Sequence, residues 1–321
     1  MHTPDETLAT TSSHIRALKD ITFGSIAGMV SKVFEHPFDL TKVRLQSQVL
    51  DASARFTGPI DCLTKTWKNE GVKGLYRGLP APIVGAMVEN ASLFLTYREL
   101  QNLIRRVTHQ PESQKLPLHQ LAIAAAGSGA VTSFLLTPIE LVKCKMQVQM
   151  LVTPSSSALS HPPLGPIAVF VSAFRSTGLT GLWLGHTGTL IRETGGTAAW
   201  FVTKEYVASL LLARRAPSSR EDQSLRPWES ALSGACAGAS FNLALFPADT
   251  VKSAMQTADE LRPKLAGQRY SPPSFFGTFL EMYKAQGIRG LYAGCGITVA
   301  RSVPSSAIIF LIFDGLTKHF G

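Results

Sequence analysis

Charged residues are scarce in this chain of 321 residues. Asp, Glu, Lys and Arg make up 17% of the sequence, whereas soluble domains carry about 25%. Hydrophobic residues make up 45%, and the mean hydropathy is slightly positive at +0.13. This balance favours a membrane protein whose helices carry some polar side chains over a soluble globular domain.

Cysteine is also scarce. The sequence has no C-x-x-C pair and no cluster of metal-ligating residues, and its four cysteines lie far apart, at Cys62, Cys144, Cys236 and Cys295. Nothing in this spacing suggests a disulfide framework or a zinc site. The eight histidines are scattered, and we find no nucleophile–base–acid set and no nucleotide-binding loop. We therefore predict no metal, no cofactor, no catalytic residues and no enzymatic activity.

The basic residues are in excess but nowhere dense. The formal net charge is +9, yet no Lys/Arg run with interleaved aromatic residues occurs. We therefore expect no nucleic-acid partner, and attribute the charge to anionic lipid headgroups. The first 20 residues lack the apolar core of a secretory signal, and Asp5 and Glu6 do not suit an acid-poor transit peptide. Any organelle address is expected inside the folded part of the chain.

One stretch of sequence occurs three times. HPFDLTKVRLQ at 36–46 is echoed by TPIELVKCKMQ at 137–147 and by FPADTVKSAMQ at 246–256. The shared frame is Pro, any residue, Asp or Glu, two residues, Lys, three residues and Gln. Its prolines recur at intervals of 101 and 109 residues, at Pro37, Pro138 and Pro247. Self-similarity at a near-constant period indicates a repeat architecture.

Other features recur in phase with this motif. Thirteen positions before each proline lies a small-xxx-small pair, which allows membrane helices to approach closely. Downstream lie NEGVKGLYRG (69–78), STGLTGLWLG (176–185) and AQGIRGLYAG (285–294), each of which ends a short helix and opens a long one. The long helices are expected at about 19–48, 81–107, 117–149, 187–213, 227–257 and 296–319.

These features predict an all-α membrane protein with six transmembrane helices in three pseudo-threefold repeats, each with a short amphipathic helix. A polar N-terminal tail at 1–18 precedes repeats at 19–107, 116–213 and 225–320. Thirty helical residues span about 45 Å, more than a hydrocarbon core of about 30 Å, so tilted or kinked helices are expected. A soluble helical-repeat protein is the alternative, and the uniformly apolar helix faces argue against it.

Each proline is followed by an acid and a lysine three residues apart. A proline inside a helix kinks it, and side chains at i and i+3 lie on one face. Around a pseudo-threefold axis, each acid can reach the lysine of the next repeat, which predicts a ring of ion pairs closing one end of a central cavity. Three solvated helix ends are the alternative, but they leave the shared spacing unexplained. The pairs in sequence are Asp39/Lys42, Glu140/Lys143 and Asp249/Lys252.

The motif, its period and the six-helix layout resemble the mitochondrial carrier family over about residues 17–320. The resemblance implies a monomer in the mitochondrial inner membrane, with both termini toward the intermembrane space, the short helices on the matrix side, and alternating access. The ring would be a matrix gate, braced by Gln46, Gln147 and Gln256. Its ion pairs would be Asp39–Lys143, Glu140–Lys252 and Asp249–Lys42. The third copy departs from the family at Ala254, where the others have Arg44 and Lys145.

The resemblance also implies a lipid site and a second gate. The glycine-rich turns leave free N–H groups at helix N-termini, where anions bind, so cardiolipin phosphates are implied at Arg77, Gly78, Gly185 and Gly294. At the cytosolic helix ends, only Glu205 and Asp314 of three expected acids are present, and none of the three bases. We therefore predict a weak cytosolic gate and a resting state open to the cytosol.

Charges also occur within the predicted spans, where they are costly and functional by default. Arg192 and Arg301 each lie seven residues after a turn glycine and so share a depth and a direction. The equivalent in the first repeat is Gly85, with Glu89 one turn further on; Glu193 follows Arg192. Two bases and two acids would thus ring the cavity near mid-membrane, where secondary transporters bind substrate. Because arginine pairs with carboxylates and acids accept ammonium groups, the set suits a cationic amino acid. Simple neutralisation of Arg192 by Glu193 or a neighbouring helix is the alternative.

Three segments indicate which subgroup of the family the sequence resembles. TLIRE (189–193), VENASLF (88–94) and ARSVP (300–304) resemble the basic amino-acid carriers of the family, and the fungal ornithine carriers in particular. This implies exchange of ornithine, with lysine, arginine, citrulline or a proton as possible counter-substrates. Glu89, Arg192, Glu193 and Arg301 match the substrate-contact positions.

Two further residues are secondary candidates for the substrate site. Lys32 faces the cavity floor by the same counting, or pairs locally with Glu35, and Asn90 neighbours Glu89. The alternatives to the whole functional hypothesis are an acylcarnitine-type or other amino-acid carrier of the same family, and a transport-inactive membrane adaptor.

Overall fold

The computed structural model describes residues 4–50, 55–111, 116–152, 164–214, 225–261 and 274–320, and all regular structure in these ranges is helical. The loop at 153–163 lies outside the described residues. The long helices are α1 (Pro4–Ser47), α3 (Pro80–Thr108), α4 (Leu118–Val152), α6 (His186–Ala213) and α10 (Cys295–Phe320), and the consecutive helices α7 (Pro227–Ala244) and α8 (Phe246–Leu261) together take the place of a further long helix. The short ones are α2 (Pro59–Leu75), α5 (Pro166–Gly181), α9 (Phe275–Leu291) and a 3₁₀ turn, η1 (Gln48–Leu50).

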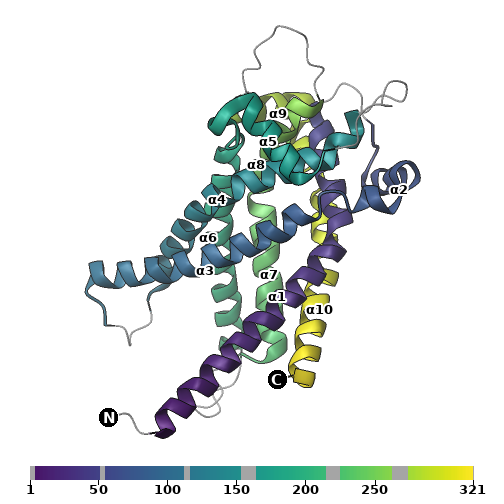
Figure 1. Ribbon diagram of the computed structural model, residues 1–321. Helices are drawn as coiled ribbons and strands as arrows, with labels where there is room; N and C mark the ends of the chain where they lie inside the picture. Colours follow the sequence, from purple (N-terminus) through teal and green to yellow (C-terminus); the bar gives the residue numbers. More distant parts are fainter. Residues whose placement is uncertain are drawn as a thin grey trace.

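The threefold repeat of the sequence is visible in the order of the helices. A long helix, a short helix and a second long helix follow one another in α1–α3 and α4–α6, and in the third repeat two helices, α7 and α8, stand for the first long one. Figure 1 shows α2, α5 and α9 toward the end of the molecule opposite the two chain termini. The all-α carrier fold predicted from the repeat is therefore confirmed.

Prolines and glycines set where the helices begin and turn. α2, α3, α5 and α7 begin with a proline, which needs no hydrogen-bond acceptor there and has a helical φ already. Each short helix contains one glycine in the left-handed region, and each turn before an even-numbered span ends in another. The glycines within the short helices are Gly71, Gly178 and Gly287. Those that end the turns before α3, α6 and α10 are Gly78, Gly185 and Gly294.

Two helix boundaries differ from the sequence expectation. α1 begins at Pro4, so most of the segment expected as a tail continues the first helix; between Pro4 and Pro37 no residue breaks a helix outright. The helix of the third repeat is interrupted at Leu245, where α7 and α8 meet at 55°. By contrast, α1 and α4 continue through Pro37 and Pro138.

The long helices pack in sequence around the bundle. α3 lies along α4, α4 along α6, α6 along α7, and α1 along α10, whereas α1 and α3 barely touch, so the ring of helices is open between these two. By length and hydropathy, Leu118–Gln149 and Phe275–Phe320 are candidate membrane spans in the described part of the chain, and up to five spans result if each bent helix pair counts as one. The charges within the bundle lower the hydropathy of the other helices.

Candidate functional site

The three motif acids pair with the lysines of the following repeats. Asp39 Oδ2 lies 2.8 Å from Lys143 Nζ, Glu140 Oε2 lies 2.8 Å from Lys252 Nζ, and Asp249 Oδ2 lies 2.6 Å from Lys42 Nζ. These are the inter-repeat pairs that the threefold frame predicts. All six side chains line one central cavity, so the ring closes its floor.

The glutamine braces expected beside these pairs are present in only one repeat. Gln46 Nε2 donates to Asp249 Oδ2 at 3.4 Å and to Thr250 at 3.2 Å. Gln256 instead donates to the Leu184 carbonyl at 3.2 Å, and the Gln147 amide has no hydrogen-bond partner among the described residues. The prediction is therefore wrong for Gln147 and Gln256, because both side chains lie against backbone of neighbouring helices and turns.

The turn glycines pack against the gate helices of the next repeat. A Cβ atom on Gly294 would lie 3.3 Å from Lys42 Cα, one on Gly185 would lie 3.3 Å from Lys252 Cγ, and one on Gly78 would lie 3.2 Å from Met146. The first two glycines thus place their turns directly beside gate lysines. Arg77, also expected at the lipid site, donates to Gln149 Oε1 at 2.9 Å.

We expect Gly294→Ala to destabilise the protein by about 1–2 kcal/mol, because a Cβ is strained at positive φ. Gly294 has φ of 81°, and the added Cβ would also press on the Lys42 backbone. The matched control is Gly296→Ala in α10, where a Cβ meets nothing within 4 Å. Thermal unfolding in detergent measures both variants, and equal melting temperatures would contradict this account of the turn.

Arg192 and Arg301 both line the cavity, with side chains 18% and 15% exposed. Arg192 Nη2 lies 3.0 Å from Glu140 Oε1, and its Nε lies 3.6 Å from Asp249 Oδ1. Arg301 Nη2 lies 3.1 Å from Asp39 Oδ1. The two arginines therefore sit directly on the gate carboxylates, which already pair with lysines, and each links the cavity to the ring beneath it.

Glu193 and Asn90 do not line the cavity, so the prediction that places them there is wrong. Glu193 is fully buried behind Arg192, which its carboxylate contacts, and neither of its oxygens accepts a hydrogen bond from a described residue. Successive helical residues point about 100° apart, so only one of the adjacent pair can face the lumen. Asn90 is exposed on α3 and is absent from the cavity lining for the same reason.

Glu89 and Lys32 complete the charged lining of the cavity. Glu89, on α3, forms no hydrogen bond or ion pair with any residue the structure describes. Lys32 lies 2.9 Å from Glu35 Oε2, so of the two roles open from sequence, its local pair is formed while its side chain still reaches the lumen. Glu89 is thus a carboxylate available to a ligand.

The sequence reasoning missed two buried ion pairs. Glu35 holds Arg301 as well as Lys32, with Arg301 Nη1 2.7 Å from Glu35 Oε2. Arg44, fully buried, makes a two-pronged contact with Glu70 at 2.5 and 2.8 Å. Each had a signal: Glu35 stands where the other repeats have leucine, and Arg44 lies two positions after a gate lysine.

The opposite end of the bundle, where α3, α6 and α10 end, has no corresponding ring among the described residues. Asp314 pairs with Lys318 on its own helix at 2.7 Å. Glu205 is exposed, and so is Arg98, which stands in the first repeat where the third acid would be, 20 residues after the turn glycine. With the opposite ring formed and this one missing, the structure corresponds to a carrier closed at the end of α2, α5 and α9.

A model of the mitochondrial carrier protein family matches residues 13–108, 114–215 and 223–321. The chain belongs to the mitochondrial carrier family. It is 39% identical to mitochondrial ornithine transporter 1 of Saccharomyces cerevisiae, over 94% of this chain and 95% of that one. It is 36% identical to a mitochondrial carnitine/acylcarnitine carrier-like protein of Arabidopsis thaliana, over 95% and 99%. It is 30% identical to the mitochondrial arginine transporter BAC1 of the same plant, over 98% of both chains.

Membership settles the class of activity of this carrier. Proteins of the family transport small molecules across the mitochondrial inner membrane and are not enzymes, so the predicted class and compartment are supported. The residues of the cavity then narrow the kind of substrate.

Proposed function

We propose that this carrier exchanges ornithine, and other basic amino acids, across the mitochondrial inner membrane by alternating access. The observation that carries the proposal is the unpaired carboxylate of Glu89, which shares one cavity with the guanidinium groups of Arg192 and Arg301. A diamino acid has one carboxylate for an arginine and a second ammonium group for Glu89. No other carboxylate that lines the cavity in the described residues lacks a partner.

Both arginines have N–H donors that a substrate carboxylate could bind. The buried Nε–H groups of Arg192 and Arg301 have no hydrogen-bond acceptor among the described residues. An arginine can bind a carboxylate with two parallel N–H donors. A substrate carboxylate would use these donors and compete with Glu140 and Asp39 for the guanidinium groups. Substrate binding would then weaken the contacts that hold the gate shut, as required of a ligand that shifts a conformational equilibrium.

The relatives support the same substrate class. The yeast and Arabidopsis proteins named for ornithine and arginine transport match nearly the full length of this chain. We further propose, from the resemblance to the family, that the gate of Asp39, Glu140 and Asp249 with their lysines faces the matrix, that both termini face the intermembrane space, and that the carrier acts as a monomer. Lysine, arginine, citrulline or a proton would be the counter-substrate. Cardiolipin phosphates would bind the backbone N–H groups after Gly78, Gly185 and Gly294.

An acylcarnitine substrate is the second candidate, favoured by the 36% identity to the carnitine/acylcarnitine carrier-like protein. Carnitine also carries one carboxylate and one cationic nitrogen. That nitrogen is quaternary, however, and has no N–H to donate to Glu89, whereas either ammonium group of ornithine does.

Reconstituted transport decides between these functions. We expect liposomes containing the purified carrier and internal ornithine to take up radiolabelled ornithine, with unlabelled ornithine competing at least tenfold better than carnitine, a difference of about 1.4 kcal/mol in binding. Stronger competition by carnitine would assign the acylcarnitine function instead, and absence of any exchange would indicate an inactive adaptor.

A further inference from the structure

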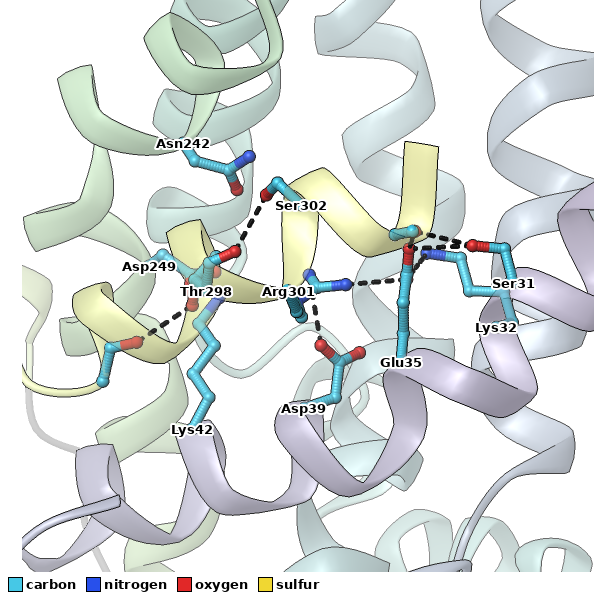
Figure 2. A network of polar contacts seen from close by, with 12 residues as sticks. Ser31, Lys32, Glu35, Asp39, Lys42, Asn242, Asp249, Thr298, Arg301 and Ser302 are labelled. Carbon is cyan, nitrogen blue, oxygen red and sulfur yellow. Dashed lines mark hydrogen bonds and ion pairs between the residues drawn. The ribbon is translucent and has the colours of Figure 1, made fainter. Parts of the chain in front are cut away.

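Glu35 lies at the centre of a buried polar cluster between α1 and α10 (Figure 2). Its carboxylate accepts hydrogen bonds from Ser31 Oγ at 3.3 Å and from Ser305 Oγ, and it pairs with Lys32 and Arg301. The two serine hydroxyls lie 2.6 Å apart. Glu35 itself does not line the cavity. It therefore acts on the lumen only through the two cations that it holds.

The charges that line the cavity do not balance. Among the described residues, six basic and four acidic side chains line it, and the three gate pairs neutralise three of each. The remainder is Lys32, Arg192 and Arg301 against Glu89, a formal charge of +2. Such a lumen repels a substrate that is itself a cation. In the described part of the chain, the two carboxylates that offset this charge lie behind the lining: Glu193 beside Arg192, and Glu35 beside Lys32 and Arg301.

This arrangement breaks the threefold symmetry. Counting from the motif prolines, Leu136 and Leu245 stand at the position of Glu35, and Phe241 stands at the position of Ser31. The two arginines therefore have different surroundings. Arg192 lies over the Phe241 ring, 5.7 Å from its centroid, whereas Arg301 faces the helix that carries Ser31 and pairs with the Glu35 carboxylate. Buried carboxylates are retained only where they are paired, so the cluster is specific to the cations of the first and third repeats.

We propose that Glu35 is a specificity-determining residue of this carrier: without touching the substrate, its charge lowers the net charge of the cavity and admits a diamino acid of charge +1. The inference rests on the proposed function. Glu35 also leaves Arg301 exchangeable, because Ser31, Ser305 and Lys32 still satisfy its carboxylate when a substrate carboxylate binds that guanidinium.

The test compares ornithine with citrulline, which has the same three-methylene side chain but ends in a neutral ureido group in place of the second ammonium group. Half-inhibitory concentrations of both are measured against labelled ornithine in liposomes for four variants: Glu35→Gln, Lys32→Gln, the double variant, and Ser305→Ala. The last is the matched control, because it removes a hydrogen bond to Glu35 and leaves the charge. Ligand-induced shifts in melting temperature in detergent give the same ratio for any variant too slow to transport.

We expect Glu35→Gln to lower the preference for ornithine over citrulline about tenfold. This is the order of magnitude of the repulsion between one additional positive charge in the cavity and the second ammonium group of ornithine, when solvent partly screens the two charges. Lys32→Gln should raise the preference, the double variant should return it to within about threefold of wild type, and Ser305→Ala should leave it unchanged. A structural role alone would slow both substrates equally, and that result, or no rescue in the double variant, overturns the proposal. Wild-type protein that does not exchange ornithine would refute the proposed function, whereas an unchanged ratio in Glu35→Gln with active wild type would refute the Glu35 inference alone.

Discussion

Glu89→Gln is expected to lower the kcat/KM of ornithine exchange by at least about 30-fold. Truncating one partner of a desolvated charge pair costs about 2–5 kcal/mol, and Glu89 is the cavity carboxylate that has no partner in the described residues to compensate. The amide is nearly the same size and leaves no buried charge unpaired, so the loss reports on the substrate. Radiolabelled exchange in liposomes measures it.

Two controls accompany this variant. Glu99→Gln removes a carboxylate from an exposed position on the same helix, ten residues further along, and should exchange ornithine at the wild-type rate. Arg192→Lys keeps a positive charge beside the buried Glu193 but loses the planar guanidinium that binds a carboxylate with two hydrogen bonds, so ornithine exchange should be impaired. Arg192→Ala is less informative, because it would also leave the buried Glu193 carboxylate without its counter-ion. If Glu89→Gln exchanged ornithine normally, the ammonium group would have to bind elsewhere in the cavity.

Glu70→Gln is expected to reduce the free energy of unfolding by about 3 kcal/mol, because breaking a buried ion pair leaves a charge without its counter-ion. Arg44 is fully buried and joins three helices: it contacts Glu70 and Thr66 on α2 and the Gln147 carbonyl on α4. Thermal unfolding in detergent should show a clearly lowered melting temperature.

The second repeat provides the matched control for this pair. Lys145 stands at the position of Arg44, and its contact with Glu260 is a single one at 3.2 Å to a carboxylate that is 31% exposed. Lys145 is buried, but the Glu260 end of the pair is partly solvated, which weakens an ion pair, so Glu260→Gln should lower the melting temperature less than Glu70→Gln does. Similar losses in both variants would mean that burial does not decide the strength of these contacts.

The sequence determined the fold and the ring of ion pairs. The prolines, acids and lysines recur at one spacing in three copies, and threefold geometry then leaves each acid one lysine of the next repeat within reach. It also located Arg192, Arg301 and Glu89 at the cavity, since equivalent positions in a repeat share depth and direction.

Only the tertiary structure decided what surrounds these groups. Whether Glu193 faces the lumen or the neighbouring helix depends on the rotation of α6, and a difference of one residue turns a side chain by about 100°. The role of Glu35 depends on Ser305 and Arg301, which lie about 270 residues away in sequence and meet it because α1 packs on α10. Repetition encodes the contacts that all three repeats share, whereas contacts unique to one interface arise from how two dissimilar helix faces fit together.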